Sequence, residues 1–398
     1  MRARALSRPY ARLAALCAIA FLLADCASPR PPAGSMDACA DPAPRFQIVY
    51  IIHGDAGYLW YDDAGIRHQA DAEALIQARR TAEEAADAEV FIFHQKPTRL
   101  LRVFHGADGT LWHYRKGRLL RRVPYARPGA GAPGRIEAGL APEAELFARF
   151  AALPAPRRCG PAAAEPPVRI LAYFGHGIPV TGKIPYNRSR PDMAFSLASF
   201  SRGLVRFGGP ACPPRKPFSL VILSACHGGS PEATMALAPF TDWVLAAPGE
   251  LHLSYLDTRA LARLARENPI PFETGHAGMW GQAIAMESFA RLGATVRTGV
   301  TVSLYETARA SEYLERHRGG WASAADPSGL EGTVAGPVLF AEPAAYRDCG
   351  LNPEFGEGGQ EAGVQVFHRA ARFGKDRGKE SHSGWECPVL EPHRASLP

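Results

Sequence analysis

Short apolar runs, separated by glycine, histidine and charged residues, recur along the chain. They are rich in β-branched and aromatic residues, which is typical of buried β-strands. The runs cover residues 46–52, 90–93, 168–174, 218–223, 243–247 and 300–304. Between the first two runs, residues 71–87 repeat apolar positions at helical spacing. A strand, a helix and a second strand in this order predict a parallel sheet.

The later runs are also separated by segments with helical character, around 142–153, 196–204, 258–267, 280–291 and 305–317. Residues 97–125 differ, because short apolar stretches alternate there with Gly-containing turns. We expect this segment to be a small antiparallel insertion. The whole pattern predicts an α/β fold, a three-layer α/β/α sandwich around a mostly parallel sheet of five or six strands.

Charge changes this picture in one place only. The 398-residue chain carries a net charge of +6, which is mild, and we expect no nucleic-acid partner. Residues 96–127, however, hold nine Lys or Arg against the single acid Asp108. This basic stretch is either a surface for an anionic partner or the solvated face of a hairpin. The 46% hydrophobic content is enough for a sizeable core, and we expect a monomer.

The amino-terminal 26 residues have the pattern of an export signal. A head with four arginines precedes the apolar stretch 13–24, whose 12 residues are too few to span a bilayer. Residues 1–26 are therefore predicted to be a signal peptide. Because residues 22–26 read Leu-Leu-Ala-Asp-Cys, either a lipid on Cys26 or ordinary cleavage near this point would follow. The mature protein is expected to be periplasmic, anchored to the outer membrane through Cys26, or secreted.

Residues 27–45, rich in Pro, Ala and Ser, are predicted to be a flexible tether, and residues 346–398, rich in Gly and charge, an irregular tail. An exported chain meets an oxidising compartment, so disulfides are allowed. Of the eight cysteines, Cys349 and Cys387 would tie down the tail if paired. Cys159 and Cys212 are a second candidate pair, and the sequence alone decides neither.

Two strand ends carry the chemistry. The run 168–174 leads into Gly175-His176-Gly177, and the run 218–223 leads into Ser224-Ala225-Cys226. The carboxyl ends of parallel strands meet at one edge of a sheet, where functional residues gather. A thiol needs a base to become a nucleophile, and an imidazole is the usual one. Cys226 is the candidate nucleophile and His176 the candidate acid and base.

The surroundings of this pair fit the same chemistry. We expect His176, and the helix start near Pro231, to lower the pKa of the Cys226 thiol. The amides of Gly177 and Cys226 are the candidate oxyanion-hole donors. His53 ends another predicted strand and is expected to line the cleft.

The order of these features resembles the caspase-like cysteine peptidases, and the clostripain-like family most of all. In that order, a strand ends in His-Gly, and about 50 residues later a second strand ends in Ala-Cys. Small residues and a helix follow the cysteine. The resemblance implies a caspase-like catalytic domain over 46–345, with 97–125 inserted, and a polypeptide substrate. It also implies the His176–Cys226 dyad. In clostripain-like peptidases an acid two positions before the cysteine selects Arg or Lys before the cleaved bond. This chain has Ser224 at that place, and Ser224, Glu250 and His53 are the residues expected to line the substrate pocket. Glu250 could supply that negative charge instead.

Two other functions stay open on the residues alone. Residues 224–228 also fit the nucleophile elbow of an α/β-hydrolase that would cleave esters or lactones, with Asp257 and His276 as partners. Alternatively, the chain is a catalytically idle envelope lipoprotein that binds a partner. No cofactor is expected, and no metal either, because no Cys-x-x-Cys or His-x-x-x-His spacing occurs.

Overall fold

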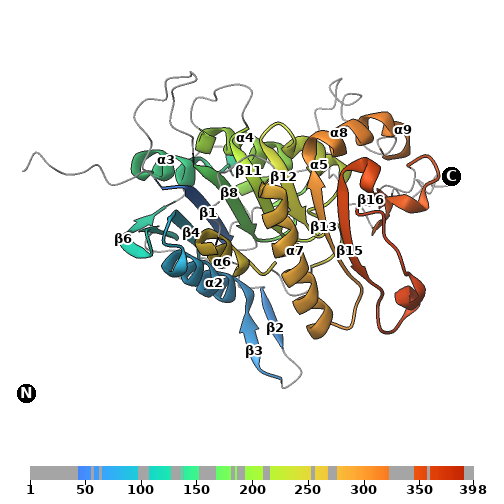
Figure 1. Cartoon of the computed structure of the whole chain (residues 1–398), viewed down its shortest axis with the longest axis horizontal. Helices are drawn as coiled ribbons and strands as arrows, with labels where there is room; N and C mark the ends of the chain where they lie inside the picture. The colour runs from blue at the N-terminus through green and yellow to red at the C-terminus, as the bar shows by residue number, and fades with distance from the viewer. Residues whose placement is uncertain are drawn as a thin grey trace, which may run out of the picture. The chain divides into compact units, whose positions relative to one another are not determined.

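A sheet of nine strands runs through the part of the chain that the computed structural model describes, with helices on both faces (Figure 1). All of the described residues belong to one compact unit. They are residues 44–54, 58–61, 65–96, 107–126, 136–137, 139–151, 167–180, 184–185, 193–208, 216–251, 256–267, 276–321, 345–355 and 359–389. The predicted signal peptide, Cys26, Cys159 and Cys212 lie outside these residues, as does most of the predicted tether.

The strand order places the two candidate strands next to each other at the centre. In spatial order the strands are β15 (Val364–Arg369), β13 (Val300–Glu306), β12 (Thr241–Ala246), β11 (Phe218–Ser224), β8 (Val168–Phe174), β1 (Phe46–His53), β4 (Ala88–Gln95), β5 (Gly109–Arg115) and β6 (Arg118–Tyr125). The five strands from β12 to β4 are parallel to one another. Two antiparallel strands are added at each side.

The predicted parallel core of the sheet is thus confirmed, but the predicted count of five or six strands is too low. The antiparallel pair predicted within 97–125 is present as β5 and β6, and because β5 also pairs with β4, it extends the main sheet. On the opposite side β15 pairs with β13. Periodicity along one segment does not reveal which distant strand completes its hydrogen bonds, so the pairing of β5 with β4 was not predicted and β15 was missed.

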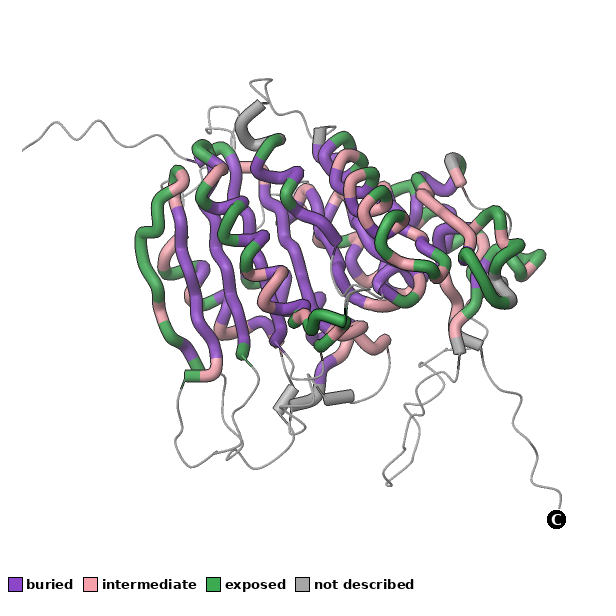
Figure 2. Tube along the Cα trace, turned by 90° about the horizontal axis from the view of Figure 1, so that it is seen from below, coloured by how far each residue is buried: buried purple, intermediate pink, exposed green. Residues whose placement is uncertain are grey.

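Side chains alternate between the two faces of each central strand and form two cores. In β1, for example, Phe46, Ile48, Tyr50 and Ile52 face one core, and Val49 and Ile51 the other. The first core is covered by α2 (Ala70–Glu84), α6 (Ala260–Glu267) and α7 (His276–Thr295). The second is covered by α3 (Ala141–Phe150), α4 (Leu197–Gly208), α5 (Pro231–Leu237) and α8 (Thr307–Arg316). The predicted three-layer sandwich is therefore confirmed, and Figure 2 shows its central strands as mostly buried.

A buried polar network ties the amino-terminal halves of β1, β4 and β8 to the carboxyl-terminal half of the antiparallel β5. Glu89 accepts a hydrogen bond from the Gln47 side-chain amide at 2.9 Å and lies 2.9 Å from the His113 Nε2. The guanidinium of Arg169 donates to Gln47 at 2.9 Å and to the carbonyl of Phe207 at 3.2 Å. Buried charged groups are stable only when they are paired in this way. The network lies at the end of the strands opposite to His176 and Cys226.

The carboxyl-terminal segment is structured, so the prediction of an irregular tail from residue 346 is wrong. Beside β15 it holds β14 (Ala345–Asp348) paired with β16 (Glu386–Val389), and a disulfide joins Cys349 to Cys387. Trp385 is completely buried in the second core. Phe355 of the same segment is also completely buried there. Two buried aromatic residues and a disulfide thus hold a segment whose composition otherwise suggests disorder, and the Cys349–Cys387 pairing is present.

The remaining elements are short. They are β2 (Leu59–Tyr61) paired with β3 (Arg67–Gln69), the small sheet of β7 (Ile136–Glu137), β10 (Met193–Phe195) and β9 (Ile184–Pro185), the helix α9 (Arg318–Trp321), and the 3-10 turns Cys349–Leu351, Gln360–Ala362 and Lys375–Gly378. Within the described ranges, every helix is too short or too polar to cross a bilayer.

Candidate active site

His176 and Cys226 leave neighbouring parallel strands at matching positions. β8 and β11 keep a register in which Ser224 lies opposite Phe174, and the Gly175 N–H donates to the Ser224 carbonyl at 3.3 Å. Each candidate residue follows its paired residue by two positions. Adjacent strands are about 4.8 Å apart. Phe174 and Cys226 both pack against the first core. His176 and Cys226 themselves lie in the turns just beyond the two strands.

Gly177 brings the histidine turn into contact with the cysteine. A methyl group at Gly177 would lie 2.8 Å from the carbonyl oxygen of Cys226 and 3.8 Å from its Cβ. No side chain fits at the first of these distances, so the close approach requires glycine. The same approach brings the backbone of Gly177, a candidate oxyanion-hole residue, alongside Cys226.

Cys226 is half-buried. The Leu251 amide donates a hydrogen bond to the Sγ at 3.4 Å. Burial raises the pKa of the Cys226 thiol, the Leu251 amide opposes this, and the carboxylates of Glu250 and Glu386 raise the pKa further. The predicted lowering of this pKa is therefore wrong. The sequence does not show which carboxylates converge on the thiol, and their repulsion of a thiolate adds to desolvation.

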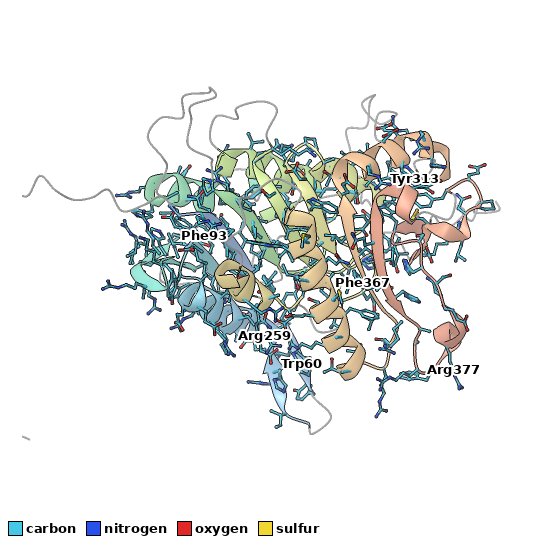
Figure 3. All side chains as sticks on the ribbon, viewed as in Figure 1. Trp60, Phe93, Arg259, Tyr313, Phe367 and Arg377 are labelled. Atoms are coloured by element: carbon cyan, nitrogen blue, oxygen red, sulfur yellow. A yellow bond between two sulfur atoms is a disulfide. The ribbon has the colours of Figure 1, made fainter. Side chains whose placement is uncertain are left out.

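An aromatic ring covers the candidate base. Tyr58 stacks on the His176 imidazole with ring centroids 4.4 Å apart and an interplanar angle of 24°. The Tyr58 carbonyl accepts a hydrogen bond from the Ala70 amide at 3.0 Å, and this bond joins the start of the β2–β3 hairpin to α2. In Figure 3, Trp60 marks this hairpin. On the other side, the Tyr173 hydroxyl donates to the His176 carbonyl at 3.2 Å. Tyr58 lies far from the strand ends in sequence, and no motif pointed to it.

The residue after the nucleophile is held from the carboxyl-terminal segment. The His227 Nδ1 lies 3.2 Å from the Glu386 carboxylate, and its ring stacks on Tyr346 at 4.0 Å. Both contacts depend on the fold of the tail, which sequence reasoning missed. The pairing of Cys349 with Cys387, beside these two residues, was the one usable signal.

Two residues expected in the substrate pocket are buried elsewhere. Ser224 is fully buried, and its hydroxyl accepts from the Leu256 amide. His53 is 2% exposed and makes edge contacts with Tyr173 and Phe195, which belong to the second core, on the opposite face from Cys226. Neither side chain reaches the surface beside the thiol, and we correct both assignments.

Glu250, by contrast, is exposed and directly precedes Leu251, whose amide contacts the sulfur. Its carboxylate is close enough to raise the thiol pKa. Of the three residues expected in the pocket, Glu250 alone combines exposure with proximity to Cys226.

Asp257, the acid that the α/β-hydrolase alternative would use, is already engaged in ion pairs. Asp257 forms ion pairs with Arg259 and, at 3.5 Å, with Arg291. Burial opposes ionisation, but the hydrogen bonds and charge of Arg259 outweigh it and lower the pKa of Asp257. The side chain of His276 lies outside the described residues. Across the described ranges, no group of three or more His, Cys, Asp or Glu residues is arranged to hold a metal ion.

Comparison with known proteins defines the class of fold. The chain matches no family model and no curated protein sequence. It is similar in structure to an inactive zymogen C11 protease from Parabacteroides distasonis, at 12% identity and a TM-score of 0.52, over 88% of this chain and 92% of that one. It is also similar to a secreted C11 cysteine protease from Bacteroides thetaiotaomicron, solved with an irreversible peptide inhibitor. That match has 13% identity and a TM-score of 0.54, over 89% and 94% of the two chains.

At this level of identity the comparison shows the fold. The chain has the caspase-like α/β fold of the C11, or clostripain-like, proteases. The resemblance drawn from the two strand ends is confirmed as far as the fold is concerned.

Proposed function

We propose that this protein is an exported cysteine endopeptidase in which Cys226 is the nucleophile and His176 the acid and base. The observation that carries the proposal is the register of β8 and β11, because His176 and Cys226 each follow, by two positions, residues that are paired in neighbouring strands. The close approach of Gly177 to Cys226 supports it, because it holds the turn that carries His176 against the turn that carries the thiol.

In this mechanism the His176 imidazole removes the thiol proton as the Cys226 sulfur attacks the carbonyl carbon of the substrate. A base in the attack step suits a thiol whose pKa is raised by burial, because little thiolate exists before the substrate arrives. The amides of Gly177 and Cys226 donate hydrogen bonds to the oxyanion. His176 then gives its proton to the departing amine and leaves a thioester on Cys226. A water molecule, deprotonated by His176, hydrolyses the thioester and restores the thiol.

For the substrate we propose a polypeptide with a basic residue before the cleaved bond. Glu250 is an exposed carboxylate beside the residue that contacts the sulfur. Ser224 is buried and has no charge to offer. The similar protease from Bacteroides thetaiotaomicron binds a peptide inhibitor, which supports the class of substrate.

Export through residues 1–26, with or without a lipid on Cys26, belongs to the same proposal. The disulfide between Cys349 and Cys387 supports it, because disulfides persist mainly in oxidising compartments.

The test is hydrolysis of a peptide library by the purified chain, with the fragments identified by mass spectrometry. Cys226→Ala and His176→Ala are each expected to abolish turnover without changing the melting temperature. His105→Ala is the matched control, because His105 also precedes a glycine but belongs to the basic stretch. Full activity in either of the first two variants would refute the proposed dyad.

A further inference from the structure

The backbone turns sharply just after the candidate nucleophile. His227 has a φ of 54°, in the left-handed region that residues with a Cβ rarely adopt. Gly228 and Gly229 follow it and have no such restriction. A strained conformation persists only when its surroundings hold it in place, so the contacts of His227 identify what maintains this turn.

Three contacts hold His227. Its amide donates to the carbonyl of Gly249 at 2.9 Å, its Nδ1 lies 3.2 Å from the Glu386 carboxylate, and its ring stacks on Tyr346 with centroids 4.0 Å apart. The two side-chain partners come from paired strands, Tyr346 from β14 and Glu386 from β16. The strained turn at the nucleophile therefore depends on a segment more than a hundred residues further along the chain.

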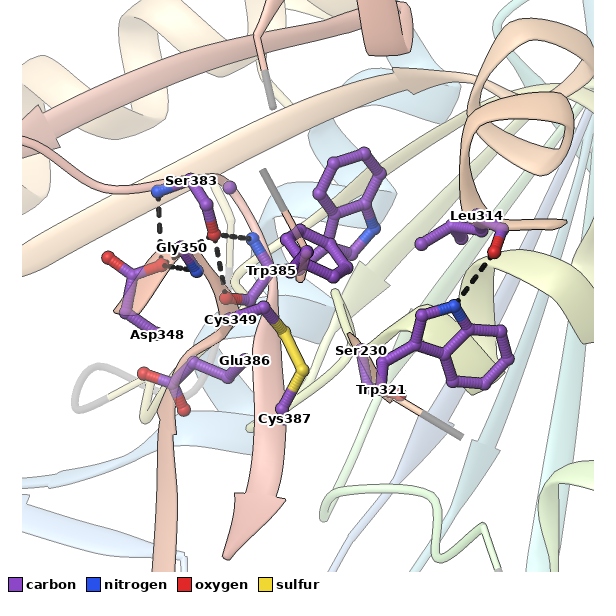
Figure 4. Close-up of a disulfide and its surroundings, with 12 residues drawn as sticks. Ser230, Leu314, Trp321, Asp348, Cys349, Gly350, Ser383, Trp385, Glu386 and Cys387 are labelled. Atoms are coloured by element: carbon purple, nitrogen blue, oxygen red, sulfur yellow. Dashed lines mark hydrogen bonds between the residues drawn. A yellow bond between two sulfur atoms is a disulfide. The ribbon is translucent and has the colours of Figure 1, made fainter. Parts of the chain in front are cut away.

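The disulfide closes this pair of strands beside the contact. Glu386 directly precedes Cys387, which is joined to Cys349 (Figure 4). Asp348 lies opposite Glu386 in the strand register and accepts hydrogen bonds from the Ser383 amide and hydroxyl. The strand that carries Glu386 is thus fixed both covalently and by hydrogen bonds.

The Glu386 carboxylate has a defined place and charge. A methyl group at Gly249 would lie 2.6 Å from the Glu386 Oε1, so the carboxylate packs directly against the backbone that also binds the His227 amide. Burial alone would raise its pKa, but hydrogen bonds with His227 and His382 outweigh burial and lower the pKa of Glu386 to about 2. It is an anion over the whole range in which a peptidase works.

We propose that Glu386 is a positioning residue for the nucleophile, which acts by fixing the His227 ring and thereby the left-handed turn that aims the Cys226 thiol. This inference rests on the proposed function of Cys226 and adds to it a part for the carboxyl-terminal segment. Glu386 touches no substrate atom in this role. It holds the backbone that follows the nucleophile, and Gly177 packs against the Cys226 backbone itself.

Three variants separate positioning from charge. Glu386→Ala removes the contact with His227, and kcat is expected to fall about tenfold to a hundredfold with KM nearly unchanged, because a misplaced reacting group slows the chemical step. Glu386→Gln keeps an oxygen that can accept from His227, and is expected to keep most of the activity that Glu386→Ala loses. Glu380→Gln is the control, since Glu380 is an exposed carboxylate of the same segment.

A second readout follows the thiol directly. The titratable groups around Cys226 are Glu250, Glu386, His176 and His227. Removing the Glu386 charge is expected to shift the alkylation of Cys226 by iodoacetamide to lower pH, measured on the peptide that contains Cys226. Both Glu386→Gln and Glu386→Ala should show this shift, and Glu380→Gln should not.

The outcomes decide the inference separately from the proposed function. Equal kcat in Glu386→Ala and the wild type would overturn it, as would equal losses in the Gln and Ala variants. Losses of kcat that merely follow a lower melting temperature, with an unshifted alkylation curve, would also overturn it. If the wild type hydrolyses no peptide, the proposed function fails, and the alkylation curve then decides whether Glu386 acts on the thiol at all.

Discussion

Replacing Gly177 by alanine tests the contact between the two strand ends. The backbone of Gly177 lies outside the left-handed region, so alanine is not excluded by its own conformation. The obstacle is the neighbour, because the new methyl group would lie 2.8 Å from the carbonyl oxygen of Cys226 and 3.6 Å from its carbonyl carbon.

The size of the effect follows from these distances. Ordinary contact begins at 3.4 Å, so the two turns must separate by about 0.6 Å (3.4 − 2.8). A displacement of about 1 Å at a reacting group can slow catalysis about a hundredfold. We therefore expect kcat to fall by about tenfold or more. Overpacking typically costs about 1–3 kcal/mol of stability, which a large chain tolerates, so Gly177→Ala should remain folded at the assay temperature.

The assay compares kcat and KM on the best peptide of the library, together with urea unfolding. Gly378→Ala is the matched control, because a methyl group there would meet no atom within 4 Å. A wild-type kcat in folded Gly177→Ala would show that the Gly177–Cys226 approach does not matter to catalysis, and the argument from this contact would be refuted.

Three further predictions concern the base, the core and the acid limit of stability. Tyr58→Ala removes the ring stacked on His176. Because such ring pairs contribute about 0.5–1.5 kcal/mol, kcat in the peptide assay should fall about two- to tenfold. Tyr58→Phe keeps the ring and should match the wild type. Glu89→Ala leaves its buried partners Gln47 and His113 unpaired and should lower the free energy of unfolding by about 3–5 kcal/mol, measured in urea. The control is Glu83→Ala, because Glu83 is exposed. This variant should change the free energy of unfolding by less than about 1 kcal/mol. Because the folded-state pKa of Glu386 is lowered from 4.5 to about 2, its contribution to stability is fully present above pH 4.5 and is lost as the pH falls towards 2. Over that interval the wild type should lose roughly 3 kcal/mol more stability than Glu386→Gln, in urea titrations at each pH, and parallel curves would contradict this.

The central part of the fold could be predicted because its signal is local. β1, β8 and β11 are short apolar runs with all or nearly all residues buried, and the two strand ends follow directly from them. The matching of His176 with Cys226 needed one further assumption only, that consecutive strands of a βαβ pattern are neighbours. The strand order bears this out for β8 and β11.

What the sequence could not reveal depends on contacts between distant segments. Glu386 is 160 positions from Cys226 (386 − 226), and Tyr58 is 118 positions from His176 (176 − 58). No local pattern links them. The sign of the thiol pKa shift was wrong for the same reason, since burial and converging carboxylates are properties of the assembled site. Phe355 and Trp385 show how a few buried aromatic residues can anchor a segment of polar composition.

The most direct measurement is the rate at which an irreversible peptide electrophile modifies the chain, with the adduct mapped by mass spectrometry in the wild type and in His176→Ala. General-base assistance typically contributes about a hundredfold to ten-thousandfold. We therefore expect the adduct on Cys226, formed at least about a hundred times more slowly without the His176 imidazole. An adduct on another residue, or equal rates in the two proteins, would contradict a thiol and an imidazole acting together from adjacent strands.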